Sequence, residues 1–194
     1  MKDQSTRGAA KGWHSRGYLP HFDSPEIIQH LVIRAADSLP AARIAALSDD
    51  SRLRFRRLDN ALDLGHGAGL LRDEGPAAIV ETAMLLFDGE RYRLIAWSIM
   101  PNHVHVLLEQ KDGFPLEGIV HSWKSFTAHA INKMCGLHGR FWAVDYFDRF
   151  IRNEDHFHRT IAYIEQNAVT AGLVATAVDW RFSSACRRVE REGL

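Results

Sequence analysis

The stretch WSIMPNHVHVLL, residues 97–108, has the pattern of two strands joined by a turn. Apolar residues fill both arms, and the Pro-Asn dipeptide between them is typical of turns. Successive side chains on a strand point to opposite faces, so His103 and His105 share one face about 7 Å apart, and Val104 points into the opposite layer. Two imidazoles on one rigid face can hold a single metal ion. The alternative is a pair of partly exposed histidines on an edge strand.

Working outward from this hairpin, the periodicity predicts an alternation of strands and helices. Strands are expected at residues 27–35, 92–100, 103–109 and 146–152. A first helix of about 20 residues is expected to end near Asn60, and further helices are expected at 76–87, 116–134 and 154–169. Apart from that inserted helix, the order is β-α-β-β-α-β, which is ferredoxin-like. We therefore expect an α+β fold with one antiparallel sheet, helices on one of its faces, and an extra C-terminal helix.

The two ends of the chain differ from this middle part. Residues 1–25 mix Gly, Ser, Arg and Pro without periodicity, which predicts a flexible N-terminal arm. Residues 26–175 are expected to form the main domain, and residues 176–194 a C-terminal tail. The glycines at 65, 67 and 69 do not have the spacing of a dinucleotide-binding loop, so we interpret them as a flexible connection.

Composition restricts the class of protein. A hydrophobic content of 46% and a charged content of 25% are ordinary for a globular protein. No apolar run approaches the roughly 20 residues that a membrane-spanning helix needs, and the first residues lack the apolar segment of a signal peptide. Two cysteines without a secretion signal favour reduced thiols in the cytoplasm. The net charge of zero neither favours nor excludes nucleic acid, so an anionic partner requires local basic patches.

The last predicted helix combines polar and apolar stripes. Tyr163 and Asn167 are four residues apart and share one helix face, whereas Ile164 and Ala168 lie on a stripe that can be buried. A phenol and an amide are thus presented side by side on an anchored helix. The alternative is a half-buried tyrosine at the rim of the core and an asparagine that caps the end of the helix.

Several motifs in this order resemble one known family. The motifs are MPNHVHVLL at 100–108, SWKSFT at 122–127, YFDRFIR at 146–152, YIEQN at 163–167 and AGL at 171–173. Together they resemble the REP-associated tyrosine transposases, which are relatives of the single-tyrosine HUH transposases of small insertion sequences. The resemblance covers nearly the whole chain, and the ordered set of motifs carries it.

The resemblance implies roles for four residues. His103 and His105 correspond to the HUH metal ligands, Tyr163, on the C-terminal helix, to the nucleophile, and Asn167 to a third, polar ligand one turn later. Two features depart from the family: Ala168 follows Asn167 where proline is common, and residues 141–145 lack a glutamine often found after the tryptophan.

A second tyrosine competes for the role of nucleophile. Tyr146 lies on a predicted strand, and Asp148, two residues further on, offers a carboxylate that could bind metal. We favour Tyr163 because its spacing from Asn167 matches the pattern of the family.

The resemblance also implies the reaction, the cofactor and the partner. The expected activity is cleavage and rejoining of single-stranded DNA at hairpin-forming repetitive extragenic palindromes, through a covalent 5′-phosphotyrosine. The two imidazoles and the amide oxygen suit Mn²⁺, and Mg²⁺ also fits. We expect a cytoplasmic, nucleoid-associated protein that acts as a monomer or a homodimer. Basic and aromatic side chains hold single strands, and the DNA-binding candidates are Lys124, Arg149, Arg152, Trp142 and Phe182.

The sequence is also compatible with two other functions. The first is a domesticated relative that binds DNA hairpins without cutting them. The second is a metallohydrolase that uses the His-x-His pair on an unrelated substrate and does not depend on Tyr163. For Trp142 and Phe182, a place in the hydrophobic core is an equally good interpretation.

Overall fold

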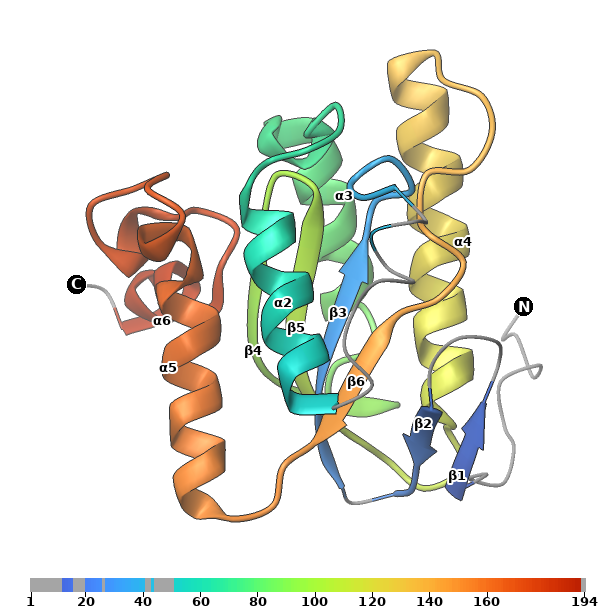
Figure 1. Ribbon diagram of the computed structural model, residues 1–194, viewed down its shortest axis with the longest axis vertical. Coiled ribbons are helices and arrows are strands. Elements are labelled where there is room, and N and C mark those ends of the chain that lie inside the picture. Colours follow the sequence, from blue (N-terminus) through green and yellow to red (C-terminus); the bar gives the residue numbers. More distant parts are fainter. Residues whose placement is uncertain (1–11, 16–19, 26, 41–42, 44–50, 193–194) are drawn as a thin grey trace.

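The computed structural model describes residues 12–15, 20–25, 27–40, 43 and 51–192, and Figure 1 shows their arrangement. The strands are β1 (Gly12–Ser15), β2 (Pro20–Asp23), β3 (Ile28–Arg34), β4 (Tyr92–Ile99), β5 (His103–Gln110) and β6 (Phe147–Phe150). The helices are α2 (Ser51–Asp63), η1 (Leu70–Arg72), α3 (Glu74–Leu85), α4 (Leu116–Cys135), α5 (Glu154–Thr170), η2 (Ala177–Asp179) and α6 (Ser184–Glu192). In this part of the chain, no helix has the length and apolar character needed to cross a membrane.

The main sheet has four antiparallel strands in the order β4-β5-β3-β6. The predicted hairpin is present as β4 and β5, which pair from Tyr92 opposite Gln110 to Ile99 opposite Val104. The first strand of this main sheet in the sequence, β3, lies between β5 and the last strand, β6. The structure therefore confirms the expected α+β class and its antiparallel sheet.

A β-bulge in β4 decides which residues of that strand face which layer. The register shifts between Leu94 and Ala96. Before the shift, Tyr92 and Leu94 pack in the same core cluster as Trp97 and Ile99 after it. Strict alternation would send these two pairs to opposite faces. The bulge lets both pairs contribute to one core, and it directs Ala96 to the other face.

Helices cover both faces of the sheet. On one face, α3 and α4 pack against the side chains of Leu31, Val104 and Val106 in the largest core cluster. The other face was not expected to carry any of these helices, and the extra C-terminal helix was not assigned to a face. This other face carries α5 and also α2, through a cluster of Val32 with two α2 leucines and a cluster of Leu107 with Ile164 of α5. Figure 1 shows α2 lying across the front of the sheet beside α5. The prediction of helices on one face is thus too simple, because the helix inserted after β3 folds over the opposite side.

Both ends of the described chain have regular structure. Within the segment predicted as an N-terminal arm, β1 and β2 form a two-stranded antiparallel sheet. Within the predicted C-terminal tail, η2 and α6 pack beside the edge strand β4. The backbone N–H of Ile99 donates to the carbonyl of Phe182 (2.9 Å), and Nε1 of Trp180 donates to the carbonyl of Ile99 (3.0 Å).

Three kinds of contact stabilise α5 and its position. Its N-terminus is capped, because Oδ1 of Asn153 accepts from the backbone N–H of His156 (2.8 Å). Its apolar stripe is buried at Ile164, which packs on β4 and β5. On its far side, Glu165 accepts from Oγ of Ser184 (2.7 Å) and pairs with Arg188 of α6. The position of α5 is therefore set by both the sheet and the C-terminal segment.

The α5 cluster predicts a large cost for Leu107→Ala. Leu107 is fully buried, and its truncation leaves a cavity between the sheet and α5. We expect the free energy of unfolding to fall by about 2–5 kcal/mol, measured by urea denaturation. Leu86→Ala is the matched control, because Leu86 is 66% exposed and its truncation is expected to change stability by less than about 0.5 kcal/mol. Equal losses in the two variants would contradict the assigned core.

The contacts of Ser184 predict a specific effect on α5. Its Oγ accepts from the backbone N–H of Trp97 (3.1 Å) and donates to Glu165. Ser184→Ala leaves both groups without this partner, which is expected to cost about 1–3 kcal/mol and to speed amide hydrogen exchange in α5. Ser125→Ala, on an exposed position of α4, is the control. Unchanged exchange in α5 after Ser184→Ala would show that α6 does not hold the helix.

Candidate metal and tyrosine site

The two histidines of β5 lie in the interior between the sheet and its covering helices. His103 and His105 are 1% and 0% exposed, so the alternative of two partly exposed histidines is wrong. Their Nε2 atoms approach to 3.0 Å, because alternate residues of one strand share a face. Burial, followed by the neighbouring His105, holds the pKa of His103 well below the ordinary histidine value. His103 is therefore neutral at physiological pH, the form that binds metal.

The turn residue Asn102 sets the tautomer of His103. The amide nitrogen of Asn102 donates to the carbonyls of Leu62 (3.1 Å) and His66 (2.9 Å). Its oxygen therefore points to His103, where Nδ1 lies 2.7 Å away. Because this oxygen only accepts, Nδ1 of His103 carries the proton and Nε2 keeps its lone pair. The Pro-Asn turn thus also prepares His103 as a ligand through Nε2.

Helix α2 adds two carboxylates that the sequence analysis did not assign. Oδ1 of Asp59 lies 3.1 Å from Nε2 of His105, and Oδ1 of Asp63 lies 3.9 Å from Nε2 of His103. Asp59 is 1% exposed. Burial raises the pKa of Asp63 to about 6, with a further increase from Asp59 and an opposing effect of His105. Two carboxylates one helical turn apart thus face the imidazole pair.

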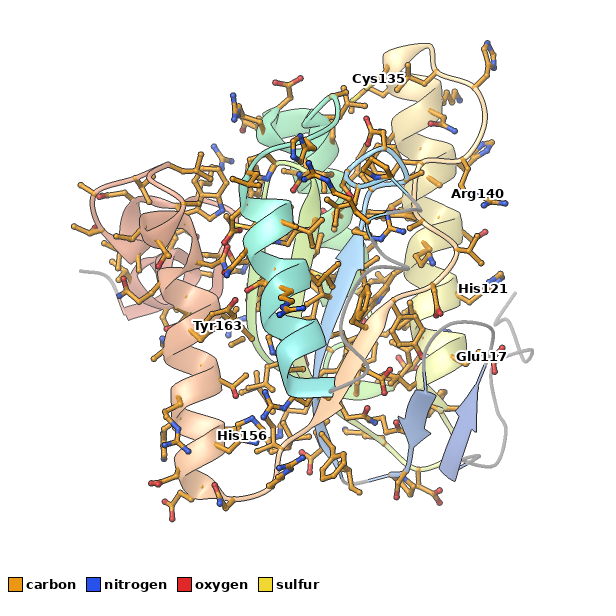
Figure 2. All side chains as sticks on the ribbon, viewed as in Figure 1. Glu117, His121, Cys135, Arg140, His156 and Tyr163 are labelled. Carbon is orange, nitrogen blue, oxygen red and sulfur yellow. The ribbon has the colours of Figure 1, made fainter. Side chains whose placement is uncertain are left out.

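Tyr163 lies on the side of α5 that faces this group. Its ring centroid is 5.9 Å from that of His105, with the rings at 90°, and 6.1 Å from that of His30. The tyrosine is 40% exposed, so its ring contacts the buried histidines while part of it stays open to solvent. Figure 2 shows the Tyr163 side chain directed from α5 toward α2 and the sheet.

Asn167 occupies the next turn of the same helix face. It is 2% exposed, and its Oδ1 atom has no hydrogen-bond partner among the described residues. A buried amide oxygen without a partner costs free energy. The C-terminal cap of α5 is Ala171, so the alternative of a simple asparagine cap does not describe its position.

These residues fit a divalent cation. Asp59, His103 and His105 each offer a ligand atom, and the three atoms lie within 4.8 Å of one another. Neither carboxylate oxygen of Asp59 makes a hydrogen bond with a described residue, although both are buried. Buried carboxylates are normally paired or bound to metal. Imidazole and carboxylate together suit several divalent ions, so the donor set does not select one of them.

Further basic groups lie beside the site on the same sheet face. His30 of β3 is directly opposite Arg149 of β6 in the register, and opposite residues share a face. Burial is the main reason that the pKa of His30 lies well below the ordinary value, followed by the charges of His105, Arg149 and His156. His156, in the first turn of α5, therefore also belongs to this neighbourhood, and Figure 2 shows it on the sheet-facing side of α5.

The five predicted DNA-binding residues do not lie together. Arg149 is on the histidine face, and Arg152 is exposed in the loop before α5, with its guanidinium 5.6 Å from the ring centre of Phe150. Lys124 lies on α4, in the opposite layer, and donates to the carbonyl of Val144 (2.7 Å).

The predictions for Trp142 and Phe182 are wrong. They are 4% and 8% exposed and belong to the largest core cluster. Nε1 of Trp142 donates to the hydroxyl of Thr127 (2.8 Å) inside that core. A ring whose faces are packed against protein is not available for stacking on a base, so the alternative interpretation as core residues holds for both.

The competing nucleophile lies on the wrong face of the sheet. Tyr146 is buried in the cluster with α3 and α4, and Asp148 pairs with Leu31 of that same face. His105 pairs with Val32, on the opposite face. The sheet therefore separates Tyr146 and Asp148 from the imidazole pair.

Two signals in the sequence point to the residues that were missed. Asp59 and Asp63 are four apart and follow Leu58 and Leu62, so one helix presents a carboxylate stripe beside an apolar one. His30 interrupts an otherwise apolar strand, which marks a polar position on a buried face. Neither signal says which sheet face the helix covers, so only the fold brings these residues to the histidine pair.

Comparisons with known proteins show what this chain is similar to. Residues 73–167 match the family model of IS200-like transposases. A solved structure described as a REP-associated tyrosine transposase bound to a REP hairpin is similar over 92% of this chain and 87% of that chain, with a TM-score of 0.59 and 19% identity. A candidate transposase from Deinococcus radiodurans R1 aligns over 79% of this chain and 96% of that chain, with 18% identity and a TM-score of 0.36. No curated protein matches.

The first of these structures shows that the two chains share a fold, and the family match covers the segment that contains His103, His105, Tyr163 and Asn167. The resemblance predicted from the sequence is thereby confirmed. The segment from residue 73 to residue 167 is thus similar to the IS200-like transposases.

Proposed function

We propose that this protein is a metal-dependent endonuclease and strand transferase that acts on hairpin-forming single-stranded DNA through a covalent link to Tyr163. One observation carries the proposal: the Tyr163 ring lies 5.9 Å from His105, whose Nε2 belongs to the buried group with His103 and Asp59. A partly exposed phenol thus lies beside a buried candidate cation site.

Tyr163 supplies the attacking oxygen in this proposal. The phenol oxygen forms a bond to phosphorus, the bond from phosphorus to the 3′ oxygen breaks, and the phenol proton ends on the departing 3′ oxygen. The products are a 5′-phosphotyrosine and a free 3′ hydroxyl. One phosphodiester replaces another, so the reverse attack by a 3′ hydroxyl can rejoin a strand without ATP. A tyrosine has an ordinary pKa of about 10, so the phenol needs assistance at neutral pH.

His103, His105 and Asp59 would hold a divalent cation, with the amide oxygen of Asn167 as a further ligand from α5. A bound Mg²⁺ or Mn²⁺ would withdraw charge from a non-bridging phosphate oxygen and orient the phosphate. The protein keeps its ligands ready for this purpose: Asn102 orients His103, and the carboxylate of Asp59 has no competing hydrogen bond from the part of the chain that the structure describes. Burial under α2 and α5 keeps bulk water from these groups.

The solved structure with the shared fold and the local basic side chains support the choice of nucleic-acid partner. The solved structure with the shared fold holds a REP hairpin, and we propose the same class of DNA for this chain. Arg149 on the site face and Arg152 in the exposed loop would contact phosphates near Tyr163. Tyr163 is 40% exposed, so the C-terminal segment that packs on β4 does not cover the tyrosine completely.

The proposal predicts that Tyr163→Phe abolishes the covalent adduct. A hairpin oligonucleotide labelled at its 3′ end keeps its label on the protein after cleavage, and a denaturing gel detects the product. We expect a loss of at least about 1,000-fold, because the nucleophile itself is removed. Tyr146→Phe, on the opposite sheet face, is the matched control and keeps the adduct.

Other results would select the competing functions. Tight hairpin binding without an adduct in the unchanged chain would indicate a DNA-binding protein that does not cut. Hydrolytic turnover that persists in Tyr163→Phe would indicate a metallohydrolase.

The ligand set predicts that Asp59→Asn weakens Mn²⁺ binding. The substitution keeps the shape of the side chain but removes its charge, and we expect the affinity to fall about 10-fold or more. Titration followed by the electron paramagnetic resonance of free Mn²⁺ measures this. Asp112→Asn, in the exposed loop after β5, is the control for the loss of one carboxylate. Unchanged Mn²⁺ affinity in Asp59→Asn, with a normal melting temperature, would remove Asp59 from the site.

A further inference from the structure

His30 is a buried histidine that the proposed chemistry does not use. It is 4% exposed on β3, and it does not belong to the group of Asp59, His103 and His105 that could hold an ion. Its Nε2 atom lies 3.1 Å from Nδ1 of His105. His30 thus contacts the ring nitrogen of His105 that points away from the candidate cation site.

The two candidate ligands of β5 have equivalent surroundings. In each, Nε2 faces the candidate cation site, and the two Nε2 atoms are 3.0 Å apart. In each, Nδ1 faces a polar partner: Asn102 for His103 and His30 for His105. A histidine that binds metal through Nε2 must carry its proton on Nδ1, and an outer acceptor for that proton fixes both the tautomer and the ring orientation.

The sheet register makes this contact a fixed feature of the fold. Val32 of β3 pairs with His105, and His30 is the preceding residue of β3 on that same face. The ring of His30 is also 5.3 Å from that of His105 and 6.1 Å from that of Tyr163. One side chain therefore contacts both a candidate ligand and the candidate nucleophile.

We propose that His30 is a positioning residue that accepts the Nδ1 proton of His105 and so presents Nε2 of His105 to the divalent cation. This inference rests on the proposed metal site. His30 acts through His105 and not as a ligand, because its Nε2 atom is occupied by the contact with Nδ1 of His105.

Two substitutions of His30 separate this role from simple packing. His30→Leu fills a similar space without an acceptor, whereas His30→Gln can place an amide oxygen near the position of Nε2. Mn²⁺ is titrated into the full chain without DNA. We expect His30→Leu to weaken Mn²⁺ binding about 10- to 100-fold and His30→Gln to restore most of the affinity. His121→Gln, at an exposed position of α4 that Figure 2 labels, is the control and binds Mn²⁺ as the unchanged chain does.

Far-ultraviolet circular dichroism checks that each variant is folded. If His30→Leu does not fold, His30→Met gives the same test with a side chain that adapts to irregular packing. Unchanged Mn²⁺ affinity in a variant without an acceptor overturns the inference. Equal losses of Mn²⁺ affinity in His30→Gln and His30→Leu also overturn it. So does a failure of the protein without substitutions to bind Mn²⁺. If the His30 variants change the Mn²⁺ affinity as expected but the chain without substitutions forms no DNA adduct, the proposed function is overturned and the role of His30 stands.

Discussion

The pairing of β3 with β5 is the constraint on which the site depends. Val32 opposite His105 and Ile33 opposite Val104 set a register in which apolar residues face α3 and α4 while three histidines face the other way. A shift by one residue would exchange the two faces and bury the imidazoles in hydrocarbon. The large apolar cluster on the α3 and α4 side disfavours such a shift. The chemistry of one face is thus secured by the hydrophobic packing of the other.

Covering the polar face is what turns two histidines into a candidate metal centre. On a bare sheet they would be solvated, and water would compete for their nitrogens. Helix α2 brings Asp59, and α5 brings Tyr163, so groups from three separate parts of the chain meet beneath two helices. Burial keeps His103 neutral, and among the described residues the buried oxygens of Asp59 and Asn167 have no hydrogen-bond partner. Such unsatisfied groups are costly in a purely structural core, and they are suited to a cation. The C-terminal segment contributes by holding α5 through Glu165.

Much of the fold was predictable because the local signals agree with the tertiary structure. The predicted strands at 92–100 and 103–109 are present as β4 and β5, and the predicted helix at 154–169 is present as α5. Alternation along β5 also put His103 and His105 on one face, as observed. The bulge near Leu94 was not predictable, because a register shift depends on packing across two strands and not on the pattern of one. Likewise, Trp142 and Phe182 have the composition of a stacking surface, and only their packing places them in the core.

The sequence by itself determined the order of the elements, the shared face of the two β5 histidines and the spacing of Tyr163 and Asn167 on one helix face, because these follow from the geometry of single strands and helices. The tertiary structure alone decided that α2 covers the histidine face, that Asp59 and His30 join the site, and that the sheet separates Tyr146 from it. The physical reason is that local periodicity specifies which residues of an element share a side. Which sides meet is decided by the burial of apolar surface throughout the fold and by the register of strands that are distant in the sequence.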